Sequence, residues 1–149
     1  MTDVRTGLKK SKWRLPKYEH RMLLNFALQY NDWVKELDYI RGLKAIQDGA
    51  GVHGSVPGDP TGSSAAKAAE LSEKIRLVDE AAEEAGEDLA LWIKESVVSR
   101  KDGRPYSYSV MRSEYRIPCS RDIFLERRRK FYYILAQKIE VREKNNEKK

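Results

Sequence analysis

The apolar positions of this chain recur at steps of three and four residues over several long segments, which is the period of an amphipathic α-helix. The first such segment covers residues 16–47 and predicts a helix of about 30 residues, about 45 Å in length. A stripe as wide as this one needs a second helix to cover it. The stripe consists of Met22, Phe26, Trp33, Leu37 and Ile40, with Leu23, Ala27, Tyr30 and Val34 beside them.

A glycine-rich stretch separates this segment from a second helical pattern. Residues 48–58 include four glycines, which predict a flexible loop. Beyond the loop, Asp59 is suited to cap a helix that has Pro60 at its first position and ends at Gly86. We expect residues 16–86 to form a long antiparallel helical hairpin, closed either within one chain or between the two chains of a homodimer. The seam of the second helix follows a four-three-four-three spacing over Leu71, Ile75, Val78, Ala82 and Ala85.

The C-terminal portion of the chain predicts three further helices. Residues 87–99 form the first, and a turn leads to a second helix that Ser107 can cap. Pro118 ends that helix, and Ser120 can cap the third. Together they predict a tri-helical helix-turn-helix domain over residues 87–141. The positions expected to face its core are Val110, Met111, Tyr115, Ile117, Ile123, Phe124, Phe131, Leu135 and Ile139.

Composition agrees with a helical protein. The chain is 40% hydrophobic and 35% charged, and its 9 Gly and 5 Pro lie mostly outside the periodic segments. We therefore predict an all-α fold of two long antiparallel helices followed by a C-terminal tri-helical helix-turn-helix domain. Residues 1–15 resemble a basic arm, disordered or loosely docked through Trp13, and residues 142–149 a charged tail. The single Cys119 excludes an internal disulfide, and the absence of a long apolar run or signal pattern predicts a cytoplasmic protein with no membrane partner.

Charge is distributed unevenly along the chain. Residues 59–99 carry 4 basic and 10 acidic side chains, whereas residues 100–149 carry 15 basic and 7 acidic ones. Lysine and arginine side chains that neutralise phosphates provide the sequence-independent part of DNA affinity. The cationic run from Arg121 to Lys130 lies inside the third helix, directly after the tight turn. This position favours double-stranded DNA as a partner over a merely solvated face.

The third helix supplies most of the candidate DNA contacts. Its N-terminus is expected to enter a major groove, where Arg121 and Asp122 would lie nearest the base edges. Arg127, Lys130 and the start of the preceding helix are expected to hold phosphates and to set the register. Arg128 lies at the edge of the apolar stripe and fits either the core or the DNA face. The full candidate set is Ser107, Tyr108, Arg112, Ser120, Arg121, Asp122, Arg127, Arg128 and Lys130.

Residues for catalysis, or for holding a metal or a cofactor, do not form a recognisable arrangement. His20 and His53 have no partners at metal-ligand spacing, and we expect His20 to be a surface or capping residue. Cys119 has no base and orienting group with which to form a nucleophilic site, and we expect it to fill an apolar gap in the turn. We therefore expect a protein that is not an enzyme and that uses no cofactor and no metal.

Several segments resemble a known family of regulators. Residues 59–61 (Asp-Pro-Thr) open a helix that is alanine-rich at residues 65–69, and residues 130–136 follow the pattern K-F-x-Y-x-x-A. Residues 13–16 loosely match a YxxLP-like entry to the first helix. In these features the chain resembles the RinA/ArpU group of phage-encoded transcription regulators, and its final unit is similar to a sigma-region-4-like helix-turn-helix.

This resemblance implies a function and a set of partners. It implies a phage or prophage protein that binds a specific double-stranded DNA sequence in the cytoplasm of a bacterial host. It also implies regulation of late or packaging genes, with RNA polymerase as a further candidate partner.

Two residues depart from the usual helix-turn-helix pattern. Many such cores have a small alanine early in the first helix and a glycine in the turn, whereas this chain has Arg112 and Arg116 near those places. A bulky residue there would either change the angle between the helices or point outward. Two other classes of protein stay open: a phage small-terminase-like packaging or assembly protein, and a helical interaction protein that does not bind DNA and uses its basic helix for solubility.

Overall fold

The architecture is almost entirely helical, which confirms the predicted all-α class. The computed structural model describes residues 12–50 and 60–147 of the chain. None of the helices in these residues is both long enough and apolar enough to cross a membrane. The elements are α2 (Lys17–Ala27), α3 (Tyr30–Ala50), α4 (Pro60–Ala85), the 3-10 helix η1 (Glu87–Leu89), α5 (Ala90–Val98), β1 (Arg100–Lys101), β2 (Arg104–Pro105), α6 (Tyr108–Glu114) and α7 (Arg121–Glu147).

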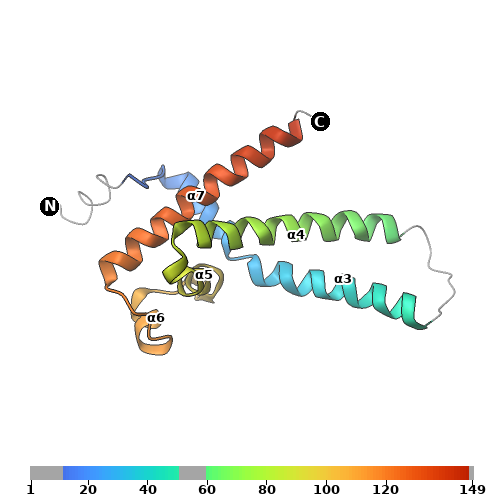
Figure 1. Ribbon diagram of the computed structural model, residues 1–149, viewed down its shortest axis with the longest axis horizontal. Coiled ribbons are helices and arrows are strands. Elements are labelled where there is room, and N and C mark those ends of the chain that lie inside the picture. The colour runs from blue at the N-terminus through green and yellow to red at the C-terminus, as the bar shows by residue number, and fades with distance from the viewer. Residues whose placement is uncertain (1–11, 51–59, 148–149) are drawn as a thin grey trace.

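Helices α3 and α4 run side by side in opposite directions and project away from the other helices (Figure 1). The predicted helical hairpin therefore closes within one chain. Its seam buries Trp33 and Leu37 of α3 together with Leu71 and Val78 of α4. Ile75 of the predicted seam is only half-buried. The heptad-like spacing of α4 thus identified its buried face, with Ile75 as the exception.

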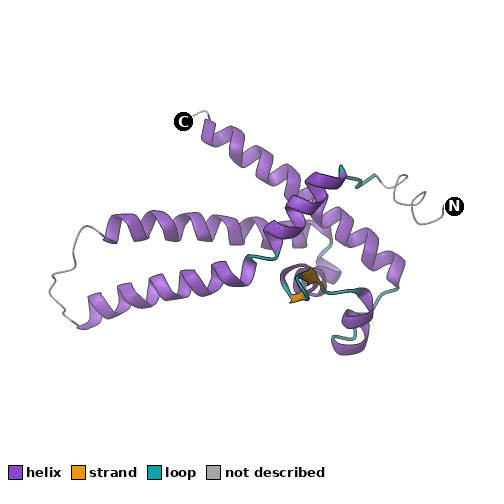
Figure 2. Cartoon of the chain, turned by 180° about the vertical axis from the view of Figure 1, so that it is seen from behind, coloured by secondary structure: helices purple, strands orange, loops and turns teal. Residues whose placement is uncertain are grey.

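The single helix predicted over residues 16–47 is interrupted, so that prediction was wrong. The N–H of Leu28 still bonds to the carbonyl oxygen of Leu24, but the N–H of Gln29 bonds to that of Phe26, at 3.2 Å, only three residues back. This tighter bond closes α2, and the chain changes direction before α3 begins (Figure 2). Neither Gly nor Pro marks the break. The chain bends there because α2 packs on α7 whereas α3 packs along α4.

Other boundaries of the long helices also differ from the prediction. Residues 48–50 belong to α3 rather than to the loop, while residues 51–59, with the rest of the loop and the predicted Asp59 cap, lie outside the described residues. Pro60 begins α4 and Gly86 follows its last residue, as predicted. Residues 142–147 continue α7 and do not form a separate tail.

The turn predicted between the first two C-terminal helices is a small antiparallel β-hairpin. Strand β1 pairs with β2, with Lys101 opposite Arg104. Asp102 and Gly103 join the strands with φ values of 55° and 76°, the positive pair that a type I′ turn requires. An Asp-Gly pair is a common signal for such a hairpin, but the two-residue strands beside it are too short to show an alternating pattern.

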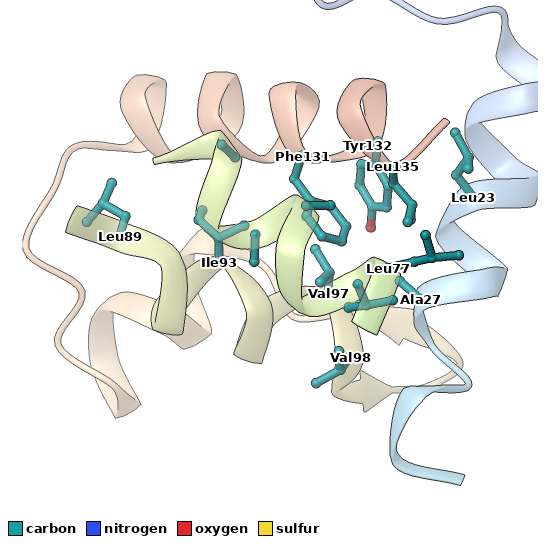
Figure 3. Packing of buried hydrophobic residues seen from close by; sticks show 14 of the residues in the cluster. Leu23, Ala27, Leu77, Leu89, Ile93, Val97, Val98, Phe131, Tyr132 and Leu135 are labelled. Carbon is teal, nitrogen blue, oxygen red and sulfur yellow. The ribbon is translucent and has the colours of Figure 1, made fainter. Parts of the chain in front are cut away.

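One apolar cluster connects α2, α4, α5 and α7. Figure 3 shows Phe131, Tyr132 and Leu135 of α7 pointing toward Val97 of α5 and Ala27 of α2. The cluster continues across the domain boundary predicted at residue 87, so the hairpin and the C-terminal helices share one core. The predicted core positions that are fully buried are Met111, Ile117, Phe124, Phe131 and Leu135.

Truncation of the central ring of this cluster should destabilise the whole fold. Phe131 has no exposed surface, so Phe131→Ala removes a large apolar side chain and leaves a cavity that helix packing cannot easily close. We expect a loss of about 3–5 kcal/mol in the free energy of unfolding, measured by urea denaturation. Leu91→Ala is the matched control because Leu91 is 77% exposed; it should change stability by less than about 0.5 kcal/mol. Equal losses in the two variants would show that α7 does not anchor the core.

Candidate nucleic-acid interface

Two serine caps define the starts of α6 and α7, as predicted. The Oγ atom of Ser107 accepts a hydrogen bond from the N–H of Val110 at 3.3 Å, and that of Ser120 accepts one from Ile123 at 3.3 Å. Each bond satisfies an N–H group that has no partner inside its own helix. Because α6 ends at Glu114, α7 begins after only a short connection.

The connection between α6 and α7 contains a residue in the left-handed conformation. Arg116 has a φ of 55°, a region that glycine occupies easily and other residues rarely. The N–H of the next residue, Ile117, donates a hydrogen bond to the carbonyl oxygen of Met111 at 3.1 Å. The side chain of Ile117 is completely buried. The exposed side chain of Arg116 points outward. Arg116, which stands where many helix-turn-helix proteins have glycine, therefore adopts the strained left-handed conformation itself.

Two predicted DNA contacts instead brace this turn by donating to its carbonyl groups. Arg112 Nη1 donates to the carbonyl oxygen of Ile117 at 2.9 Å, and the hydroxyl of Tyr108 donates to that of Cys119 at 2.6 Å. Burial raises the pKa of the Cys119 thiol, which keeps it protonated at neutral pH. Cys119 packs on the edge of the apolar cluster, in agreement with its predicted packing role.

Arg127 joins α7 to the corner that follows α4. Its Nη1 atom lies 2.7 Å from Oδ1 of Asp88, and the hydrogen bond lowers the pKa of the Asp88 carboxyl. Gly86 has a φ of 150°, and a Cβ atom at this position would collide with the Arg127 guanidinium. The positive φ favours glycine here, and a side chain at this position would push the flexible guanidinium of Arg127 away from Asp88. Arg127, predicted to hold a phosphate, forms an ion pair with a carboxylate that is itself 70% exposed.

Arg128 is half-buried, and its guanidinium is turned toward the protein. Its Nη1 atom donates to the carbonyl oxygen of Tyr106 at 2.6 Å, and its guanidinium lies 4.8 Å from the ring centroid of Phe124. Burial lowers the pKa of Arg128. Of its two predicted alternatives, the structure therefore gives Arg128 the core position.

The exposed candidates gather at the start of α7. Ser120, Arg121 and Asp122 are all exposed there. Ile123, expected in the core, is 47% exposed. The correction follows from helix geometry: each residue turns the helix by about 100°, so the burial of Phe124 directs Ile123 away from the core.

Lys130 lies further along α7, and Ser107 lies exposed at the start of α6. The Nζ atom of Lys130 lies 5.2 Å from the ring centroid of Trp13, and Trp13 in turn packs edge-on against Tyr133 at 5.5 Å. Of the arm predicted over residues 1–15, the structure describes residues 12–15, and these are docked on α7 through Trp13.

Two aromatic residues and His20 differ from their predicted positions. Tyr115, expected in the core, is 38% exposed, whereas Tyr132 is 2% exposed and was not predicted to be buried. Burial raises the pKa of Tyr132 to about 12. His20 is half-buried, with its ring edge-on to Tyr132 at 4.9 Å, rather than on the surface or in a cap. The burial of Tyr132 could have been predicted from its spacing, because it lies four residues after Arg128 and three before Leu135 on the same face of the helix.

No protein-family model, no curated protein and no solved structure matches the chain. Within the part of the chain that the structure describes, no group of His, Cys, Asp and Glu side chains is arranged to hold a metal ion.

The strain at Arg116 can be measured by replacing the residue with glycine. A left-handed conformation costs a residue with a Cβ atom about 1–2 kcal/mol, part of which is offset because glycine is more flexible when unfolded. We expect Arg116→Gly to be more stable than Arg116→Ala by about 1 kcal/mol in urea denaturation. The alanine variant is the control for loss of the side chain itself. If alanine is the more stable of the two, the left-handed turn is not present in solution.

His20 should make stability depend on pH. Burial and then the positive charges of Arg128 and Arg129 lower the pKa of His20 in the folded protein. As the pH falls through about 6.5, the unfolded chain therefore takes up this proton before the folded one does, and stability decreases. We expect unfolding free energy to decrease more between about pH 7.5 and about pH 5.5 in the parent protein than in His20→Gln. The same pH dependence in both proteins would contradict this placement of His20.

Proposed function

We propose that this protein binds double-stranded DNA through α6, the turn and α7, and that it acts as a sequence-specific transcriptional regulator of a phage or prophage. Late or packaging genes are the expected targets, and RNA polymerase is a candidate partner at the promoter. The observation that supports the proposal best is the start of α7. There a serine-capped helix presents Arg121 and Asp122 to solvent directly after a tight turn.

A rigid support holds this helix start. Phe124 and Phe131 are both completely buried within the first three turns of α7. The turn before the helix is held by Arg112 and Tyr108 through hydrogen bonds to its carbonyl groups. A helix that is fixed at both its base and its entry can enter a major groove, about 12 Å wide, without a large loss of conformational freedom.

The chemistry of the exposed side chains suits the edges of base pairs. The guanidinium of Arg121 can donate two hydrogen bonds to O6 and N7 of a guanine, and the carboxylate of Asp122 can accept one from N4 of a cytosine. Arg127 and Arg128 are assigned to internal support because their donors already bind Asp88 and the Tyr106 carbonyl. Phosphate contacts are therefore assigned to Lys130 and to the start of α6 at Ser107.

Arg121 provides the direct test of base readout. The preferred duplex is first selected by the parent protein from a randomised DNA library, and Kd values are then measured on that duplex and on an unrelated one. Arg121→Ala should weaken binding to the preferred duplex by about 1–3 kcal/mol more than binding to the unrelated one. The reason is that only the preferred duplex offers Arg121 a matching base edge.

Arg41→Ala is the matched control, because Arg41 is an exposed arginine of α3 far along the hairpin. It should leave the ratio of the two affinities unchanged. An equal loss on both duplexes in Arg121→Ala would contradict base readout by this residue. A parent protein without duplex affinity at about 0.15 M salt would contradict DNA binding altogether and would favour a helical interaction protein.

A phage small-terminase-like packaging or assembly protein is the second candidate, and the hairpin is the observation that favours it. Tyr39 is 66% exposed and Leu43 is 44% exposed on α3, where the hairpin projects from the core. These side chains offer apolar surface to another copy of the chain, either in a homodimer or in a larger ring. Light scattering distinguishes the two functions, because a ring of many subunits favours packaging whereas a monomer or dimer favours regulation.

A further inference from the structure

A second basic surface lies beside the candidate site, where the N-terminal segment meets the middle of α7. Residues 12–21 contain four basic side chains and one acidic one. All four basic residues are exposed; the last two lie in α2, which packs on α7 (Figure 2). We name this the arm surface, and it consists of Lys12, Arg14, Lys17, Arg21, Arg129 and Lys130.

Aromatic contacts hold the N-terminal segment on α7. The ring of Trp13 packs edge-on against Tyr133, with the Nζ atoms of Lys12 and Lys130 at 4.9 and 5.2 Å from its centroid. Seven residues further along the chain, the ring of His20 packs edge-on against Tyr132. These two contacts keep the cations of the segment beside those of α7 and fix their relative positions.

The cations of the arm surface lack acidic partners. Within residues 12–50 and 60–147, none of the six forms an ion pair with a carboxylate, whereas Lys74 and Lys138 elsewhere are paired with glutamates of α4. A depression of about 330 Å³ runs beside Lys12, Trp13 and Lys130. Its Asp88 is already neutralised by Arg127, which leaves Glu126 as the acidic side chain on its rim.

We propose that the arm surface binds the phosphate backbone of the same DNA duplex whose major groove receives the start of α7. This inference rests on the proposed function. Arg121 and Lys130 are nine residues apart, about 14 Å along the helix, which is close to the width of a major groove at about 12 Å. Nine residues also turn the helix by about 900°, or two and a half turns, so the two side chains point from opposite faces of α7. Lys130 and the arm therefore meet backbone rather than the base edges that Arg121 reads.

The salt dependence of binding tests the arm surface. Each phosphate contact adds about 0.9 to the slope of log affinity against log salt concentration. The double variant Lys12→Gln/Arg14→Gln should therefore reduce the magnitude of this slope by about 1–2. It should also weaken binding to the preferred and to the unrelated duplex by the same factor. The control Lys35→Gln/Arg41→Gln removes the same charge from exposed positions on α3 and should leave the slope close to that of the parent protein.

Trp13→Ala tests the anchor without any change of charge. It should lower the slope in the same direction as the double variant, because the released segment no longer holds its cations beside Lys130. Circular dichroism and urea denaturation check that this variant is folded.

Each result then decides between distinct conclusions. Equal slopes in the two double variants, or a slope change found on single-stranded but not on double-stranded DNA, overturn the arm surface. A changed base preference in Lys12→Gln/Arg14→Gln overturns its assignment to phosphate. In all three cases a sequence-dependent loss in Arg121→Ala would still uphold the proposed function, whereas absence of any duplex binding by the parent protein refutes both.

Discussion

The burial of one side of α7 is the interaction on which the rest of the structure depends. Phe124, Phe131 and Leu135 are completely buried, and they join α7 to α2, α4 and α5 in one apolar cluster. The α3–α4 hairpin and the C-terminal helices are thereby parts of one core rather than two separate units. The same helix presents Arg121 to solvent at its start. The direction in which the candidate DNA face points is therefore fixed by the packing of the phenylalanines.

Polar groups around the turn between α6 and α7 complete this arrangement. A left-handed Arg116 persists because the burial of Ile117 and the hydrogen bond from Arg112 to its carbonyl leave the chain no easier path. Arg127 fastens the other side of α7 to Asp88. Arg112, Arg127 and Arg128 thus support the fold, so the number of positive charges in the C-terminal third overstates the charge available to a polyanion.

Two groups of charged side chains are assigned to DNA in the proposals above. One is the start of α7, where Arg121 and Asp122 offer few but specific donors and acceptors. The other is the arm surface, where cations alternate with aromatic rings and specificity is not required. A helix-turn-helix protein that divides its contacts in this way would read bases with one end of α7 and gain sequence-independent affinity with its middle. The two kinds of contact contribute differently to DNA recognition.

The sequence by itself determined the features that depend on neighbours within a few turns of chain. These are the caps at Ser107 and Ser120, the seam of α4, and the burial of Phe124, Phe131 and Leu135. Helical period and capping are local properties, and so they can be recognised along the chain.

Only the tertiary structure decided the features whose causes lie far apart in sequence. The break between α2 and α3 follows from the two different helices on which they pack, and no residue type at the break signals it. Arg127 finds Asp88 at a separation of 39 residues, and Arg128 finds the Tyr106 carbonyl at 22. Trp13 meets Tyr133 from the opposite end of the chain. A side chain's period on its helix shows which face it occupies, but only the packed fold determines which group it meets there.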